Sequence, residues 1–539
     1  MIIIKKYSVH LFFVLTLVLG IFLVKDFGIN IEEHTQRYSG LYWLDYVLSY
    51  TNFNNLKILV GKKLEIAYDP QLPNIDTYGP IFDLPAALIE TIFNITDSKK
   101  YFQLRHYLIF LIFYLSSIFF FKIILSRFKN VNLSLIATFL FVITPRIFGD
   151  SFHNNKDILF LSILTISFYY LQKFYQKKRI FDLIIFAIFC SLGFSTRVTA
   201  LFVPVMFIVI NFFDNYKKLN IFFKETFLVL AIFFIALIIH WPYLWENPIH
   251  NFINIISNPT KNLYSLFILF NSKYYLTNNL PDYYLLFWIF ISTPLITIFL
   301  YLVGIYFALI RFIHRLTNIS IEKKYKDLWR GNNEKFENFC LISLLGILFV
   351  ASTFSLPFIS GWRHFYFLHF FFIYFLTYGL HYLIKIYNIY KQTLFIGFLC
   401  ALISISSSVT FHPYESLYFN KFFTKFIKNG FQVDMPSLSA TEALETILKD
   451  TKKNKIYIGT AAYVPLERFL DFVEFNIKKN KEIFFVGTEF KYADYIYTNY
   501  IYEVDIKYNK KYEIPKNFYN FKTKTIDNIK IFSIYKKNY

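Results

Sequence analysis

The chain has 539 residues, of which 56% are hydrophobic and 17% are charged, with a formal net charge of +20 and a mean hydropathy of +0.41. Ordinary soluble domains do not reach that hydropathy, so the composition excludes a simple soluble enzyme and favours a polytopic membrane protein. The positive charge is spread through loops and tail without a basic stripe, so the sequence predicts no nucleic-acid partner.

Apolar stretches long enough to cross a membrane alternate with short polar loops. The first follows Lys5 and Lys6 and runs from Tyr7 to Val24 without a small-residue cleavage site, so we interpret it as a transmembrane helix rather than a signal peptide. We expect eleven spans, at 7–26, 104–126, 131–148, 157–173, 181–194, 198–213, 224–241, 283–310, 338–357, 364–384 and 392–411.

Basic residues distinguish the two sides of the predicted membrane. With the N-terminus inside, every inner loop is rich in lysine and arginine, whereas the first outer loop, 28–103, holds more carboxylates than cations. An odd number of spans then places the C-terminal segment outside. The basic inner loops lie at 122–129, 173–179, 217–224, 311–337 and 385–391.

The predicted fold class is a polytopic α-helical membrane protein with a small C-terminal α/β domain. Residues 1–411, with the first outer loop, form the predicted transmembrane domain, and residues 412–539 form the outer domain. A helix is predicted at Ser437–Asp450, with Ser439 and Glu442 spaced as a capping box. A second helix is expected at Val464–Lys478, and strands at Lys455–Gly459, Glu482–Val486, Ala493–Thr498 and Ile529–Tyr535.

Carboxylates stand at the outer ends of two spans. Glu32 and Glu33 open the first outer loop, and Asp157 stands where the fourth span begins. Adjacent residues on a helix or strand do not face the same way, so at most one of the two glutamates is expected to point into a site. The alternative is a solvated loop start for the glutamates and a charge at a helix N-terminus for Asp157.

Several cationic or titratable residues also lie at outer span ends, where the loop rule disfavours positive charge. As a set they favour an anionic headgroup, because guanidinium groups bind phosphate bidentately. Each alone can instead be a side chain that snorkels or pairs with a nearby carboxylate. The set comprises Arg146, Lys156, Arg197, Arg363 and His364.

The order of these motifs along the chain resembles the GT-C glycosyltransferases, in particular the branch with protein O-mannosyltransferases and the lipid A aminoarabinose transferase. The resemblance extends over nearly the whole chain. It is carried by Glu32-Glu33, Tyr78-Gly79-Pro80 to Glu90, Pro145 to Asp157, Trp241–Pro248, His412 to Asn420 and Ala493 to Tyr500.

The resemblance implies that a sugar moves from a polyprenyl-phosphate carrier to an acceptor on the outer face, with inversion at the anomeric carbon. The first-loop acid is the expected base, Glu33 with Glu32 as the alternative, and Asp157 matches the second acidic position. Some relatives use a divalent cation such as Mg²⁺ or Mn²⁺, for which Glu33 and Asp157 offer oxygen ligands. The cations named above are expected at the donor phosphate, with Tyr78, Trp241, Tyr243 and His412 as further site candidates.

The resemblance also implies a bacterial inner (plasma) membrane, with a cytoplasmic N-terminus and a periplasmic or otherwise extracytoplasmic C-terminal domain. Expected partners are the lipid-linked donor, membrane lipids and a lipid, glycan or protein acceptor. The alternatives are a transporter or flippase of lipid-linked sugars and a ligase or polymerase of surface glycans. A transporter would tend to hold ionisable residues at mid-membrane and to show internal repeats, whereas here they gather at the outer ends.

Overall fold

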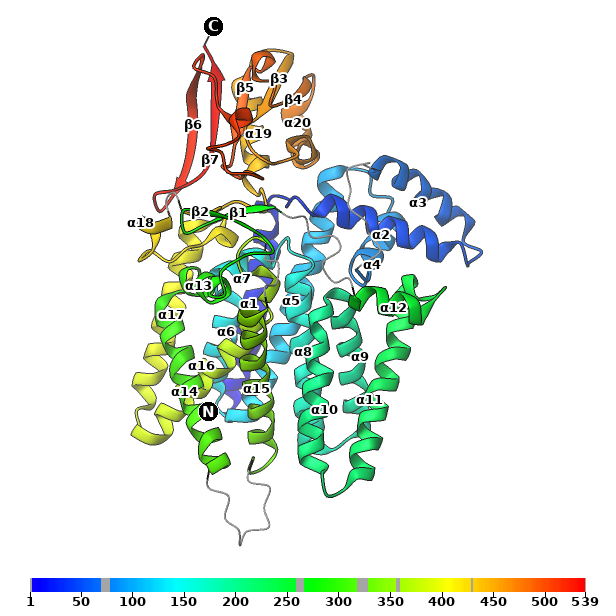
Figure 1. Ribbon diagram of the computed structural model, residues 1–539, viewed down its shortest axis with the longest axis vertical. Coiled ribbons are helices and arrows are strands. Elements are labelled where there is room, and N and C mark those ends of the chain that lie inside the picture. Colours follow the sequence, from blue (N-terminus) through cyan, green and yellow to red (C-terminus); the bar gives the residue numbers. More distant parts are fainter. Residues whose placement is uncertain are drawn as a thin grey trace.

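The structure is a computed structural model that describes residues 2–68, 78–257, 266–317, 328–354, 359–427 and 430–538, with side chains from residue 7 onward except 425 and 426. A bundle of long helices carries a sheet domain at one end, with the short helices α2, α3 and α4 beside it (Figure 1). In the described part of the chain, nine helical segments are long and apolar enough to cross a membrane. The predicted fold class is confirmed.

Two shorter apolar helices occupy the positions of the predicted third and fifth spans. All eleven predicted spans therefore have an apolar helical counterpart in the structure. These helices are α1 Ile2–Leu23, α5 Ser98–Phe128, α6 Val131–Ile143, α8 Asp157–Lys177, α9 Ile180–Thr196, α10 Phe202–Asn215, α11 Leu219–His240, α14 Leu295–Thr317, α15 Asn332–Thr353, α16 Leu368–Tyr387 and α17 Tyr390–Phe411.

Prolines correct the limits of two predicted spans. The span expected at 131–148 ends at Ile143, because Pro145 begins the separate helix α7, Pro145–Asp150. The span expected at 283–310 divides into α13, Tyr284–Ile291, and α14, with Pro294 just before the second helix. Proline has no backbone N–H and disfavours helical geometry in the residue before it, so it breaks a helix that hydropathy alone would continue.

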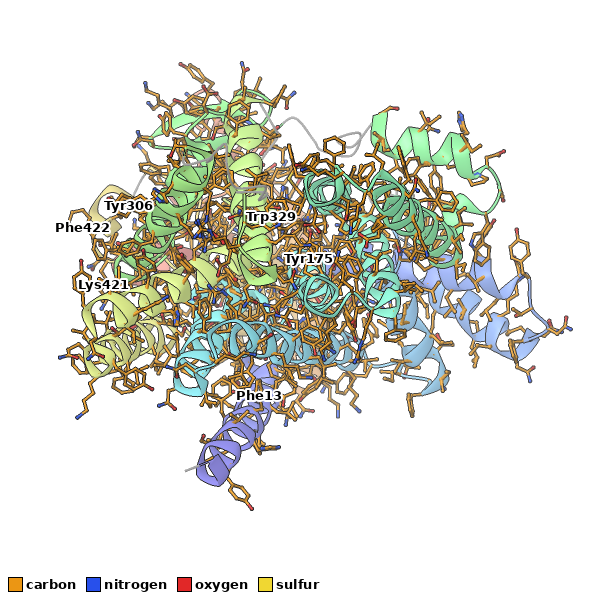
Figure 2. The ribbon with its side chains drawn as sticks, turned by 90° about the horizontal axis from the view of Figure 1, so that it is seen from below. Phe13, Tyr175, Tyr306, Trp329, Lys421 and Phe422 are labelled. Carbon is orange, nitrogen blue, oxygen red and sulfur yellow. The ribbon has the colours of Figure 1, made fainter. Side chains whose placement is uncertain are left out.

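Helix α1 stands at the edge of the bundle, and only 11% of its apolar window is buried. Figure 2 shows it projecting from the body of the molecule, with Phe13 where it meets its neighbour. There the ring of Phe13 packs edge-on against Tyr114 and Phe121 of α5, with centroids 6.2 and 5.7 Å apart. A helix apolar on nearly all sides is what a lipid-facing span requires.

The described part of the first outer loop folds into three short helices: α2 Glu33–Leu48, α3 Asn54–Ala67 and α4 Asp83–Ile92. A buried charge cluster joins them, because Glu90 of α4 accepts from Arg37 of α2 at 2.8 Å and from Lys63 of α3 at 3.3 Å. This cluster holds the three short helices together.

Short elements connect the helices at the end of the bundle near the sheet domain. The β1–β2 hairpin turns through Asn271 and Ser272, both with positive φ, as a two-residue hairpin turn requires. These elements are η2 Val198–Leu201, η3 Pro242–Leu244, α12 Pro248–Ser257, β1 Phe267–Phe270, β2 Lys273–Leu276, η4 Arg363–Phe365, η5 Glu415–Leu417 and α18 Thr424–Ile427.

The C-terminal domain is a five-stranded mixed sheet in the order β4-β3-β5-β7-β6, with helix α19 packed against it. Strand β3 is parallel to both β4 and β5, and β7 is antiparallel to β5 and β6. The sequence missed β6, and the helix predicted at Val464–Lys478 is instead η6 and α20. The elements are α19 Ser439–Asp450, β3 Lys455–Thr460, η6 Leu466–Phe472, α20 Phe475–Lys478, β4 Glu482–Gly487, β5 Tyr495–Thr498, β6 Phe518–Ile526 and β7 Ile529–Lys537.

The predicted capping box at Ser439 and Glu442 is wrong. The N-terminal N–H groups of α19 are satisfied by Asp434, whose carboxylate accepts from Leu438 N at 2.8 Å and from Ser439 N at 3.1 Å. Glu442 instead accepts from the Tyr414 hydroxyl at 2.7 Å. A side chain upstream of the helix therefore takes the capping role that the sequence spacing assigned to a serine inside it.

The predicted basic loops gather at one end of the bundle, opposite the sheet domain, and the N-terminus lies toward that end (Figure 1). Carboxylates partly neutralise them there. Glu337 pairs with Arg127 and Arg311, and Glu334 lies 2.9 Å from Arg315. Three further predicted loop lysines, Lys323, Lys324 and Lys326, lie outside the described residues.

Candidate active site

Charged side chains from four distant segments converge between the bundle and the sheet domain. The segments are the turn before α2, the N-terminus of α8, the end of α9 and η4. They bring together Glu32, Lys156, Asp157, Arg197, Arg363 and His364, which we call the charged cluster.

Glu32 and Arg363 form the ion pair at the centre of the charged cluster. The Glu32 side chain is 35% exposed and that of Arg363 is 13% exposed, so the pair borders solvent on the glutamate side. Burial acts to raise the pKa of Glu32, but Arg363 and Lys156 outweigh it and hold the pKa below its ordinary value. Glu32 is therefore a carboxylate at neutral pH.

Glu33 has different surroundings, because its side chain is only 1% exposed. Its Oε1 accepts the backbone N–H of Asn30 at 2.9 Å, while the Asn30 side-chain oxygen accepts the N–H of Glu32 at 2.8 Å. This reciprocal pairing closes the turn that leads into α2, with the same Asn-x-x-Glu spacing as a capping box. It directs Glu33 inward and leaves the preceding residue, Glu32, facing the cations.

The turn that carries Glu32 is also tied to two distant segments. The Asn30 amide donates to the carbonyl of His153 at 2.9 Å, and the N–H of Ile31 donates to the carbonyl of Pro436 at 3.0 Å. His106 of α5 also contacts the turn, because its Nε2 lies 2.9 Å from Glu33 Oε2. These contacts position the Glu32 backbone from the bundle and from the C-terminal segment together.

Asp157 begins α8 and pairs with Arg197, which follows α9. Asn154 holds the carboxylate in place, because its amide donates to Asp157 Oδ2 at 2.9 Å and its oxygen accepts the Asp157 N–H at 2.9 Å. Arg363 Nε lies 4.0 Å from Asp157 Oδ2. Arg363 thus stands between the two carboxylates of the charged cluster.

Lys156 lies over the ring of Tyr78, with Nζ 3.9 Å from the ring centroid. The backbone at the next residue, Gly79, donates its N–H to the Ser195 carbonyl at 2.8 Å. A Cβ on Gly79 would lie 2.5 Å from Ser195 Cβ, so glycine is required for this approach. The Gly79–Ser195 contact therefore helps to position the Tyr78 ring against the Lys156 ammonium group.

His364 is a neutral member of the charged cluster. Burial lowers the pKa of His364 well below its ordinary value, and Arg197 and Arg363 lower it further. At neutral pH it adds hydrogen-bonding capacity rather than positive charge. Lys156, Arg197 and Arg363 still outnumber Glu32 and Asp157, so the charged cluster favours a further anion at its open side.

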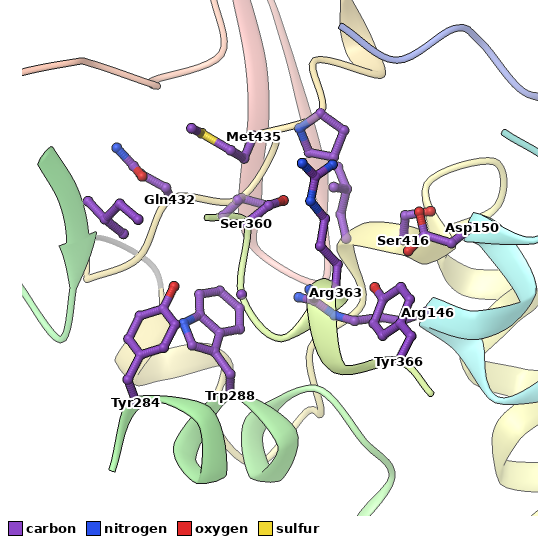
Figure 3. A pocket seen from close by; sticks show the side chains of 15 residues that line it. Arg146, Asp150, Tyr284, Trp288, Ser360, Arg363, Tyr366, Ser416, Gln432 and Met435 are labelled. Carbon is purple, nitrogen blue, oxygen red and sulfur yellow. The ribbon is translucent and has the colours of Figure 1, made fainter. Parts of the chain in front are cut away.

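A pocket borders Arg363 on the side of α13 and the C-terminal linker, the segment Gln432–Leu438. The pocket is small and partly open to solvent. Figure 3 shows Tyr284 and Trp288 on one side, Asp150 and Ser416 on the other, and Arg363 between them. The predicted phosphate ligand Arg146 lines this pocket with Arg363, whereas Lys156 and Arg197 are not among its lining residues.

The remaining predicted site residues lie apart from the charged cluster. Trp241 is fully buried and packs against Phe194, with ring centroids 6.2 Å apart, and Tyr243 accepts from Asn251 through its carbonyl. His412 bridges Glu415 at 2.8 Å and Asp26 at 3.1 Å, where the first and last spans meet. The contacts of these three residues are those of structural side chains.

The carboxylates proposed as metal ligands do not converge. Glu33 is held by His106 and Asn30, whereas Asp157 pairs with Arg197. Among the residues that the structure describes, no group of three histidine, cysteine or acidic side chains is arranged to hold a metal ion. Glu33 and Asp157 therefore do not form a common site for a divalent cation in this arrangement.

Several residues that shape the site escaped the sequence analysis as functional candidates. The spacing Asn30-x-x-Glu33 is a readable capping signal that distinguishes the two glutamates. His106 and Tyr366 carry no such signal, because each lies within an apolar segment where a polar residue has no assigned partner until the helices pack. The pocket residue Gln432 likewise depends on the path of the linker.

A family match covers part of the chain. Residues 83–245 match the family described as dolichyl-phosphate-mannose-protein mannosyltransferase. The match covers less than half of the chain and includes Arg146, Lys156, Asp157 and Arg197. It confirms the resemblance to this branch of glycosyltransferases over that segment. No curated protein sequence matches the chain.

Solved structures provide more distant likenesses. The oligosaccharyltransferase of Archaeoglobus fulgidus, in its apo form, has 13% identity and a TM-score of 0.47, covering 82% of this chain; the chain spans 58% of its length. ArnT from Cupriavidus metallidurans, bound to undecaprenyl phosphate, has 9% identity and a TM-score of 0.44, with 98% of both chains covered. The archaeal AglB with an inhibitory peptide and a dolichol-phosphate has 11% identity and a TM-score of 0.45, covering 92% of this chain and 70% of its own.

Proposed function

We propose that this protein is a membrane glycosyltransferase that moves a sugar from a polyprenyl-phosphate donor to an acceptor at the outer membrane face, with inversion at the anomeric carbon. The observation that carries the proposal is the Glu32 carboxylate, which borders solvent in a cluster where cations outnumber carboxylates. Such a site combines a base for an incoming hydroxyl with positive charge for a departing phosphate. The family match supports a phosphate-linked sugar donor.

In the proposed reaction the acceptor oxygen forms a bond to the anomeric carbon while the bond from that carbon to the phosphate oxygen breaks. Glu32 takes the acceptor proton. The bonding electrons leave with the polyprenyl phosphate, whose added negative charge is stabilised by Arg363, Arg197 and Lys156. Atoms and charge balance without a redox partner.

The Glu32–Arg363 ion pair couples donor binding to the basicity of the Glu32 carboxylate. A carboxylate tied to a guanidinium is a weak base, because the pairing lowers its pKa. A donor phosphate that forms an ion pair with Arg363 weakens the Glu32–Arg363 pair. Glu32 therefore becomes a stronger base when the donor is bound. Glu33, enclosed by Asn30 and His106, serves in this scheme as a positioning residue.

We place the site at the extracytoplasmic side of a bacterial inner membrane. The basic loops at the opposite end of the bundle support this orientation through the positive-inside rule. The acceptor then approaches between the first outer loop and the C-terminal domain. Transport of a lipid-linked sugar and ligation or polymerisation of surface glycans are the rival outcomes of the test below.

Transfer of radiolabelled sugar from a panel of polyprenyl-phosphate donors, in membranes that carry wild type or Glu32→Gln, tests the proposal. We expect label to move into a lipid, glycan or protein fraction with wild type alone. Transbilayer movement of the donor without any transfer would support the transporter instead. Label added to a growing glycan chain would identify a polymerase or ligase.

A further inference from the structure

Arg146 is a buried cation whose partners are mostly uncharged. It is 5% exposed, and its Nε donates to the carbonyl of Tyr418 at 2.9 Å. Its guanidinium carbon lies 5.2 Å from the ring centroid of Trp288 and 4.9 Å from that of Phe419. Aromatic faces and one carbonyl orient the guanidinium, but they supply no full negative charge to balance it.

The nearest acid is a weak counter-ion. Asp150 interacts with Arg146 through the hydroxyl of Tyr366, and no ion pair within 4.0 Å joins Arg146 to a carboxylate among the described residues. Burial raises the pKa of Asp150 to about 7, so much of it is uncharged at neutral pH. A buried charge without a firm partner is costly, and a bound anion would remove that cost.

Arg146 and Arg363 both line the pocket described above (Figure 3). Arg146 Nη2 is buried without a hydrogen-bond partner, and Arg363 Nε has no hydrogen bond and only a 4.0 Å contact with Asp157 Oδ2. The amide of Gln432, on the opposite wall, is fixed because its nitrogen donates to the carbonyl of Tyr502 at 3.3 Å. Two guanidinium groups at one small pocket, one of them with an unpartnered N–H, are suited to an oxyanion.

We propose that this pocket is a second oxyanion site, which takes a phosphate or carboxylate group of the acceptor while the donor phosphate lies at Lys156 and Arg197. The assignment to the acceptor rests on the proposed transferase function. Arg363 borders both places, so a group held beside Arg146 lies next to Glu32 and the reacting centre. The acceptor class is therefore an anionic lipid or glycan rather than a neutral sugar or a simple protein hydroxyl.

Calorimetric titration of the full-length protein in neutral detergent with inorganic phosphate tests the site, alone and with saturating undecaprenyl phosphate. We expect wild type to bind phosphate in the presence of the lipid. Loss of a charged hydrogen-bonding partner typically weakens binding by about tenfold or more, which is the effect expected for Arg146→Gln. Lys156→Gln is the matched control, which should weaken lipid binding and leave phosphate binding within about twofold.

Three results would overturn the proposal: no phosphate binding by wild type, exclusion of phosphate by the lipid, or unchanged phosphate affinity in Arg146→Gln. Arg146→Lys keeps the charge but not the planar fork and should weaken binding less, which guards against a folding defect in the glutamine variant. The two proposals remain separable. Absence of lipid binding and of transfer, with phosphate still bound at Arg146, would reject the transferase and leave the anion site.

Discussion

Glu33 and His106 meet in the interior, with 2.9 Å between Glu33 Oε2 and His106 Nε2 and only 1% of each side chain exposed. This contact assigns different tasks to two adjacent glutamates. The buried one holds the turn, and its neighbour Glu32 faces Arg363 and the solvent. The following predictions depend on that division.

The first prediction compares Glu32→Gln with Glu33→Gln. Loss of a general base typically lowers turnover by about 10²–10⁴-fold, which is the effect expected for Glu32→Gln. Donor affinity should not fall in this variant, because Arg363 is released from its ion pair with Glu32. Glutamine at position 33 can still accept from Asn30, so this variant should lower stability more than turnover. Single-turnover transfer and thermal unfolding measure the two effects. A turnover loss confined to Glu33→Gln would return the base to Glu33.

The second prediction concerns the acid limb of the pH–rate profile. Arg363 holds the pKa of Glu32 below its ordinary value, so Arg363→Gln should raise that pKa. The ionised base is lost as pH falls through its pKa, and the acid limb should therefore move to higher pH. Arg197→Gln, which removes the partner of Asp157 instead, should move the limb less. Equal shifts in both variants would argue against a specific Glu32–Arg363 coupling.

The third prediction concerns Asp434, the cap of α19. Burial raises the pKa of Asp434 from the ordinary value of 3.8 to about 6 in the folded protein. The stability that the protonated carboxyl contributes is therefore fully present below pH 3.8 and is lost as pH rises through about 6. Asp434→Asn keeps a capping oxygen without this titration. The stability of this variant relative to wild type should therefore be higher at neutral pH than at pH ~4. Asp434→Ala should lose about 1 kcal/mol through the missing cap. Thermal unfolding across this pH range measures both, and an identical pH dependence of wild type and Asp434→Asn would contradict the assignment.

The fourth prediction concerns metal dependence. Because Asp157 pairs with Arg197 and Glu33 with His106, exhaustive chelation should leave transfer unchanged. Turnover measured after dialysis against chelator, with and without added Mg²⁺ or Mn²⁺, checks this. Activity lost on chelation and restored by one of these ions would show that the carboxylates exchange their cationic partners for a metal.

The fifth prediction tests sidedness. Cys190, Cys340 and Cys400 are all buried, so introduced cysteines can be labelled against a low background. Tyr508→Cys, at a residue 89% exposed in the C-terminal domain, should react with an impermeant maleimide in intact cells. Lys217→Cys, between α10 and α11, should react only after the membrane is opened. The reverse pattern would invert the proposed orientation.

Hydropathy and charge were sufficient to predict the helical bundle, because each span must satisfy its own backbone and basic loops remain on one side. They failed at Pro145 and Pro294, where proline ends a helix inside an apolar run, and at Asp434, whose capping role depends on a buried turn. A hydropathy average over a window of residues registers neither a proline break nor a side chain that caps a helix.

The candidate site was predictable as a set but not in its roles. Charge at outer span ends was enough to select Glu32, Asp157, Lys156, Arg197 and Arg363, which the structure brings together. Their pairing, and the separation of Arg146 behind Tyr366, depend on contacts between residues far apart in the sequence. The capping pattern at Asn30 was the one local signal that separates Glu32 from Glu33.

The C-terminal linker, Gln432–Leu438, has a mechanical consequence. It forms a wall of the Arg146 pocket, holds the turn before Glu32 through Pro436, and is fastened to the sheet domain where Asn499 donates to the Asp434 carbonyl at 3.0 Å. The linker therefore couples the sheet domain to the reacting groups, alongside a second contact in which the His34 ring lies 2.9 Å from the Arg468 carbonyl. Exchange of the outer domain between relatives at residue 411 would replace part of the catalytic cavity along with it.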